Sequence, residues 1–304
     1  MIESYGFSDL VYNLTVSYLE GRKHYTSYGN QTSMLCSFNS GVVQGSGLGP
    51  ILYIITASGY CIYNECNKAI KYADDSYITI PYSKSYTIES EINHFQIWAE
   101  SCNLAVNKEK TKLIIFHGHG LKDELIQQFR DEITSSIKCV SSLNFLGVTI
   151  TEYLKMNEHM QNIVSKSCKM LYALKILQSK GMSSDQLEIV FGSTVISYVS
   201  YAINSWYGFC SKDDCAQLGK IIKRGIKLGY WSMNRKSLDN IFEVASQNLF
   251  HKVLNNDKHV LRLLLPEMHS CKYDLRKVSH GRILPELLGK HDMHNYILHM
   301  LYKH

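Results

Sequence analysis

The alternation of apolar and polar positions changes character midway along the chain. Apolar residues recur at helical spacing in segments 10–19 and 88–102. Extended runs are predicted around them at 23–40, with a turn at Gly29-Asn30, and at 69–73, 76–80 and 112–116. A short strand pair is predicted around 145–150. From Thr151 onward the period becomes 3.6, and helices are predicted at 160–178, 184–206 and 215–230. The pattern therefore predicts an α+β fold with a domain boundary near Thr151.

Two segments, 48–63 and 190–207, are apolar enough to be compared with membrane spans. Both contain Ser, Thr, Asn or Gly and fall short of the clean run of about 20 apolar residues that a spanning helix needs. We interpret both as buried core helices. The first residues, Met1-Ile2-Glu3, lack the basic and apolar regions of a secretory signal, so an intracellular protein without a transmembrane helix is expected.

Composition adds little to this picture. Hydrophobic residues make up 45% and charged residues 19%, which is typical of a globular chain. The net charge of +5 agrees with a polyanionic partner without requiring one. The nine cysteines lack the tight spacing of a zinc site and are interpreted as free, buried or half-buried thiols. His291, His294 and His299 fit helix-surface positions better than metal ligation.

The pair Asp74-Asp75 is the strongest chemical signal. It lies between two apolar extended runs, which predicts a hairpin with two carboxylates at its tip. For an arbitrary Asp-Asp pair, a solvated turn is the plainest explanation. Two adjacent negative charges are also what a divalent cation such as Mg²⁺ requires, because it prefers hard oxygen ligands.

Four motifs occur in order around this pair. They are Gly-Val-Val-Gln-Gly-Ser-Gly-Leu-Gly-Pro at 41–50, Tyr-Ala-Asp-Asp at 72–75, Leu-Ala-Val-Asn-Lys-Glu-Lys-Thr-Lys at 104–112 and Phe-Leu-Gly-Val at 145–148. Together they resemble the reverse transcriptase domain of non-LTR (LINE-type) retrotransposons. That resemblance implies a partial polymerase palm at 1–150, an antiparallel sheet with packed helices. It also implies a helical thumb at 151–235, followed by a helical C-terminal region of unknown role at 236–304.

The resemblance also implies roles for individual residues, with an RNA template, a DNA primer and deoxynucleotide triphosphates as partners. Catalysis would use Asp74, Asp75 and Lys110, with both aspartates as Mg²⁺ ligands in a two-metal site. The nucleotide and template would be bound by Gln44, Gly45, Ser46, Tyr72 and Ala73. The primer grip would be Phe145, Leu146 and Gly147. Candidate phosphate contacts on the thumb are Lys166, Lys169, Lys175, Lys220, Lys223, Arg224 and Lys227.

The sequence departs from the family pattern at three places. Val43 replaces a proline, and Thr56-Ala57-Ser58-Gly59 replaces the usual Ile-Asn-Asp-Leu. The family's first motif, an aspartate-bearing strand, should lie upstream of the first helix, so the chain is expected to be N-terminally truncated. Asp9 and Glu20 are poorly placed to substitute, and the chain alone is expected to be inactive. The alternatives are a catalytically dead nucleic-acid-binding or interaction protein and a relic without a stable product.

Overall fold

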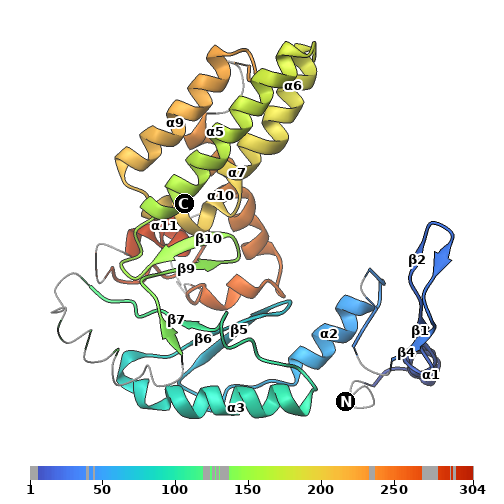
Figure 1. Cartoon of the computed structure of the whole chain (residues 1–304). Coiled ribbons are helices and arrows are strands. Elements are labelled where there is room, and N and C mark those ends of the chain that lie inside the picture. The colour runs from blue at the N-terminus through green and yellow to red at the C-terminus, as the bar shows by residue number, and fades with distance from the viewer. Residues whose placement is uncertain are drawn as a thin grey trace. The chain divides into compact units, whose positions relative to one another are not determined.

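The computed structural model describes residues 6–38, 41–43, 45–118, 124, 127, 130, 137–232, 237–268, 280–287, 289 and 292–303. Helices and small sheets alternate in these residues, which confirms the α+β class (Figure 1). The chain divides into two compact units, residues 1–111 and 112–304. The domain boundary near Thr151, predicted where extended segments give way to helices, stays a prediction.

The described part of the first unit contains three α-helices, all in segments where the sequence predicted a helix, and three short antiparallel strand pairs. The turn at Gly29-Asn30 joins β2 to β3 as expected. The elements are α1 (Asp9–Leu19), β1 (Lys23–His24), β2 (Ser27–Tyr28), β3 (Gln31–Thr32), β4 (Cys36–Ser37), α2 (Gly49–Ser58), β5 (Lys68–Tyr72), β6 (Asp75–Thr79) and α3 (Ile88–Ser101).

Segment 48–63 contains the predicted helix, α2, but the prediction that this helix is buried in the core is wrong. In α2 only Gly49 and Leu52 are buried, whereas Ile51 is 52% and Ile54 63% exposed. The sequence of α2 has no polar face, so its pattern could not indicate which side of the helix is covered.

The second unit begins with two strand pairs and continues as helices. The elements are β7 (Lys112–Leu113), β8 (Lys138–Cys139), β9 (Ser142–Phe145), β10 (Val148–Thr151), α5 (Asn157–Ser179), α6 (Ser184–Phe191), a π-helix (Gly192–Ile196), α7 (Ser197–Ser200), α8 (Ile203–Trp206), α9 (Lys212–Lys227), α10 (Leu238–Asn255) and α11 (Tyr296–Lys303). Among the described residues the strands form five two-stranded pieces, of which β7–β8 is parallel.

The largest hydrophobic core lies among the helices of the second unit. Its fully buried members include Leu174, Phe191, Val195, Trp206 and Leu218, and Val148 joins it from β10. This confirms segment 190–207 as core. Capping boxes open α6 and α9, where a serine hydroxyl and the side chain three residues on satisfy the first backbone groups.

The predicted single helix at 184–206 is interrupted. The helix widens into the π-turn, α7 ends at Tyr201, and Ala202 adopts a left-handed backbone with φ of 48° before α8 restarts. Phe191, Val195, Val199 and Ile203 are spaced by four residues, which drifts around a 3.6-residue helix. The wider π-turn returns them to one face, so the apolar pattern continues through the interruption.

The C-terminal segment packs on α10. Phe250 forms a second small core with Ile297, Met300 and Leu301, and the Tyr296 hydroxyl donates to the Ser246 carbonyl at 2.8 Å.

The surface assignment of the C-terminal histidines is wrong for two of them, and His291 lies outside the described residues. His294 is half-buried and bonds the Gly208 carbonyl. His299 is also half-buried, and burial, with the charge of Lys303, lowers its pKa.

The eight described cysteines are free, as predicted, but Cys36, Cys61, Cys66 and Cys168 are exposed and not buried. Among the described residues, no helix has the length and apolar character needed to cross a membrane.

The close approach of α9 to α6 gives a first testable prediction. A Cβ added at Gly225 would lie 2.4 Å from the Phe191 ring, whereas one at Gly219 on the same helix meets nothing within 4 Å. Gly225→Ala should therefore lower the free energy of unfolding by about 1–3 kcal/mol through overpacking. Gly219→Ala should raise it by up to about 1 kcal/mol through helix propensity. Urea denaturation of both variants measures this, and equal effects would contradict the packing.

Candidate functional site

Asp74 and Asp75 lie at the tip of the β5–β6 hairpin, as predicted. Tyr72 pairs with Asp75, so Ala73 and Asp74 form a two-residue loop. Ala73 has φ of 47°, a left-handed conformation that a residue with a Cβ adopts only at a cost. Both aspartates are exposed, and Tyr72 is 63% exposed. The turn therefore presents two carboxylates to solvent on a fixed backbone.

Two side chains join this hairpin to α2. The Lys71 ammonium donates to the carbonyl of Ala57 at 2.6 Å, in the last turn of α2, and to that of Tyr60 at 2.8 Å, just beyond the helix. The Tyr53 hydroxyl faces Asp74. Burial raises the pKa of Tyr53, and the charge of Asp74 and a hydrogen bond to it add to that rise. Nothing in the sequence pattern singled out either residue.

A buried carboxylate fixes the loop that leads into β5. Glu91 of α3 is fully buried and accepts hydrogen bonds from the Tyr60 hydroxyl at 2.8 Å and from the Tyr63 N–H at 2.9 Å. Asn64 donates its backbone N–H at 3.3 Å and Asn67 its side-chain amide at 2.8 Å. Burial alone would raise the pKa of Glu91, but these donors outweigh it and hold the pKa below its usual value.

The donor chemistry of the hairpin fits a hard divalent cation in part. Within the described ranges, neither Asp74 nor Asp75 forms an ion pair, and the Tyr77 hydroxyl at 3.5 Å from Asp75 is a weak partner. Two carboxylates are the share that proteins commonly give Mg²⁺. A third carboxylate does not join them: the described part of the chain has no group of three or more His, Cys, Asp or Glu.

Of the residues predicted in the loop that would bind the nucleotide, the structure describes Gly45 and Ser46. Gln44 lies outside the described residues. Gly45 has φ of 82°. Ser46 uses its hydroxyl within the turn, donating to the Val43 carbonyl at 2.8 Å and accepting from the Gly49 N–H at 3.0 Å.

Lys110 is exposed, and its turn is held by Asn107, whose side chain accepts from the Lys110 N–H at 3.1 Å. No ion pair between Lys110 and Asp74 or Asp75 occurs among the described residues.

The predicted primer-grip residues form the second tight turn. Phe145 pairs with Val148, so Leu146 and Gly147 are the two-residue loop between β9 and β10. Their φ angles are 47° and 87°, both left-handed, as in a type I′ hairpin turn. Gly147 adopts a left-handed backbone without steric cost, whereas the side chain of Leu146 disfavours this conformation.

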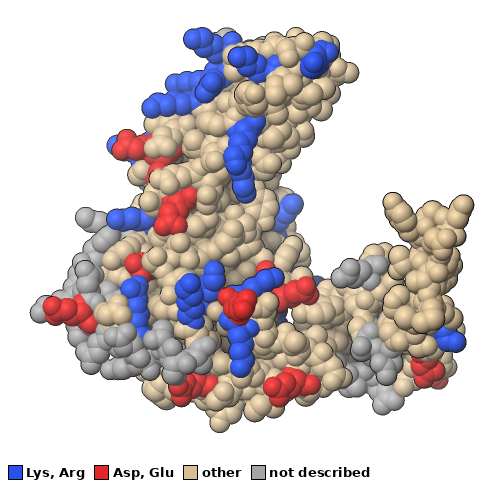
Figure 2. Space-filling model, viewed as in Figure 1, with Lys and Arg blue, Asp and Glu red and all other residues tan. Residues whose placement is uncertain are grey.

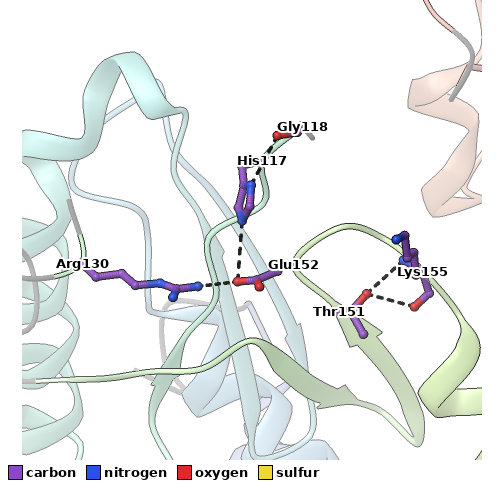
Figure 3. A network of polar contacts seen from close by, with 6 residues as sticks. All are labelled: His117, Gly118, Arg130, Thr151, Glu152 and Lys155. Atoms are coloured by element: carbon purple, nitrogen blue, oxygen red, sulfur yellow. Dashed lines mark hydrogen bonds and ion pairs between the residues drawn. The ribbon is translucent and has the colours of Figure 1, made fainter. Parts of the chain in front are cut away.

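Beyond β10, Glu152 lies between two basic side chains (Figure 3). Arg130 donates to its carboxylate, and the His117 ring lies 3.7 Å from the same oxygen. The Thr151 hydroxyl accepts from the Lys155 N–H and donates to the Lys155 carbonyl, both at 3.0 Å. These contacts fix the direction of the chain between β10 and α5.

The predicted phosphate contacts lie on the exposed faces of α5 and α9. Figure 2 shows Lys and Arg gathered over these two helices. All seven candidates are exposed, and Lys166 also lies over the Tyr198 ring at 5.8 Å. The opposite face of α9 is buried through Leu218, Ile221 and Ile222. The basic faces are therefore carried on helices held by the core.

His159, just beyond the second turn, is 4% exposed. Its Nδ1 accepts the Thr149 N–H of β10 at 3.3 Å. Burial, with the charge of Lys166, lowers its pKa to about 4, so the ring is neutral at pH 7.

Comparison with known families matches one segment of the chain. Residues 8–150 match the family described as reverse transcriptase (RNA-dependent DNA polymerase), a range that includes both tight turns. This part of the chain is a reverse transcriptase domain.

The relatives of the chain indicate which type of reverse transcriptase domain this is. Over 177 residues the chain is 28% identical to the "Retrovirus-related Pol polyprotein from type-1 retrotransposable element R1 2" of Nasonia vitripennis, covering 55% of this chain and 43% of the relative. It is 27% identical over 176 residues to the "RNA-directed DNA polymerase from mobile element jockey" of Drosophila melanogaster, covering 52% of this chain and 18% of the relative. The domain is of the non-LTR retrotransposon type. The chain spans less than half the length of either relative, and no solved structure matches it.

The buried carboxylate gives a prediction on stability and pH. Glu91→Gln places an amide N–H₂ among donors and should lower the free energy of unfolding by about 3 kcal/mol at pH 7. Because the folded pKa is lowered, the contribution of the carboxylate is present above the ordinary value of 4.5 and is lost as pH falls through the folded pKa. The gap between wild type and variant should therefore narrow at low pH in urea titrations.

Glu89→Gln, on the exposed side of the same helix, is the control. A Glu91 variant no less stable than this control at pH 7 would contradict the role of the carboxylate.

Proposed function

We propose that the chain supplies the palm and thumb of an RNA-directed DNA polymerase from a non-LTR retrotransposon, acting on an RNA template, a DNA primer and deoxynucleotide triphosphates. The observation that supports this best is the exposed Asp74-Asp75 pair on a braced two-residue turn, inside the segment that matches the reverse transcriptase family. Segment 1–150 would be the palm and 151–235 the thumb, with 236–304 packed as a further helical region.

Each part of the site would have a separate task. Asp74 and Asp75 would hold Mg²⁺, which when bound stabilises the attacking and leaving oxygens of nucleotidyl transfer. Lys110 would place a positive charge, or a proton, at the departing phosphate. The loop of Gly45 and Ser46 would line the nucleotide pocket together with Gln44, Tyr72 and Ala73. The Leu146-Gly147 turn would hold the primer strand.

A second candidate function is a nucleic-acid-binding or interaction protein without catalysis. It is favoured by one observation: only two carboxylates gather at the hairpin within the part of the chain that the structure describes. We therefore expect the chain by itself to hold metal and nucleic acid without efficient primer extension. The two functions differ in whether Asp74 and Asp75 are required: a polymerase needs both carboxylates, whereas a non-catalytic binding protein would tolerate their replacement.

The metal site can be tested by binding. In the presence of a deoxynucleotide triphosphate and a primer–template duplex, Mn²⁺ should bind the wild-type chain, and electron paramagnetic resonance should detect the protein-bound metal. The double variant Asp74→Asn, Asp75→Asn should lose this bound-metal signal. Duplex affinity, measured by fluorescence anisotropy in the same samples, should change little. Unchanged metal binding in the variant would favour the non-catalytic protein. Extension by the wild-type chain alone would overturn its expected inactivity.

The thumb surface predicts a change in salt dependence. Lys220→Ala and Lys223→Ala should each weaken duplex binding and reduce the slope of log affinity against log salt by about 1. Lys252→Ala, an exposed lysine on α10 outside the predicted surface, should leave the slope unchanged. Equal slopes in all three variants would place the duplex elsewhere.

A further inference from the structure

The Leu146-Gly147 turn is covered by a residue from far along the chain. The Tyr201 hydroxyl donates to the Leu146 carbonyl at 2.9 Å. Its ring lies 3.2 Å from the position that a Cβ on Gly147 would occupy. A second contact of the turn is local, from the Gly147 N–H to the Asn144 side chain at 2.8 Å. Tyr201 thus holds the left-handed Leu146 from outside the hairpin.

Tyr201 is itself fixed by the interruption in the helix. It closes α7 with an extended backbone, and Ala202 after it is left-handed. The Tyr201 carbonyl, released from the helix, accepts the Trp206 indole N–H at 2.8 Å. Trp206 is fully buried, so this bond ties Tyr201 to the core. A continuous α-helix would have paired that carbonyl internally.

The contacts return to the hairpin through His159. Its ring meets the Trp206 indole edge to face, with centroids 5.2 Å apart at 70°. His159 Nδ1 accepts the Thr149 N–H of β10. The hairpin is therefore contacted at two places: Tyr201 bonds the turn, and His159 bonds strand β10. Trp206 contacts both Tyr201 and His159 and so links these two residues. We name Tyr201, Trp206 and His159 the turn brace.

We propose that the turn brace positions the predicted primer-grip turn, with Tyr201 as a positioning residue that sets where the 3′ end of the primer strand lies. The inference rests on the proposed function. The brace makes the hairpin and the interrupted helix move as one piece, so the basic faces that hold the duplex and the turn that holds its terminus keep a fixed relation.

The test uses the full chain with an RNA template and a DNA primer carrying 2-aminopurine at its 3′ end. Binding of the wild type should change the fluorescence of that base, and anisotropy gives the duplex affinity. Tyr201→Phe should keep the affinity within about twofold, because the lysines are intact, yet lose most of the fluorescence change. Amide exchange in residues 142–150 should accelerate about fivefold, the effect of one lost hydrogen bond.

Tyr230→Phe is the matched control. Its hydroxyl also makes one 2.9 Å bond, to Gln178, away from the turn. It should leave both the base fluorescence and the exchange of 142–150 unchanged. A merely structural role for Tyr201 would make the two variants alike in fluorescence, which would overturn the proposal.

The outcomes separate the two proposals. If the wild type fails to bind the duplex, the proposed function fails, and exchange in 142–150 decides whether the brace holds the turn. If the wild type binds and Tyr201→Phe gives the wild-type fluorescence and exchange, the brace is wrong while the function stands. Trp206→Phe, which removes the indole donor, should reproduce the Tyr201 effect without adding to it when the two are combined.

Discussion

Left-handed backbone at Ala73 and Leu146 is the constraint on which both tight turns depend. Each turn joins two strands through two residues, and each places a residue with a side chain where glycine is normally favoured. Such a conformation persists only when its surroundings over-determine it. The contacts around each turn are therefore part of the candidate site, because without them the two carboxylates or the predicted primer grip would lose their fixed direction.

The contacts that support the two turns differ in chemistry between the two units. In the first, Lys71 reaches the end of α2, and the buried Glu91 carboxylate collects four donors from the loop before β5. An isolated buried charge would be costly, so its stabilising effect depends on every donor being present. In the second unit the brace is aromatic: Trp206 and His159 pack edge to face in the core, and each contributes one hydrogen bond.

The helices of the second unit combine support with a binding surface. The residues that bury one face of α9 alternate with the lysines and the arginine on its other face, and α5 is built the same way. Because long basic side chains stay exposed while their helix is fixed by the core, the spacing between charges is set by the bundle. The backbone positions of these basic residues are therefore fixed before a polyanion binds to this face.

The sequence by itself determined the elements whose cause is local. The β5–β6 and β9–β10 hairpins fall where extended segments were predicted, and α6 begins at Ser184 as predicted. The helix predicted from residue 215 begins earlier, at Lys212, because the Ser211 capping box starts it. The sequence also placed Asp74 and Asp75 at a hairpin tip. Only tertiary structure decided the helix interruption at Tyr201, the exposure of Ile51 and Ile54, and the burial of Glu91 and His159. Tyr201 and Leu146 are 55 positions apart, and a contact at that separation leaves no period in the sequence. Local hydrogen bonding is encoded residue by residue, whereas burial and bracing depend on which surfaces meet after folding.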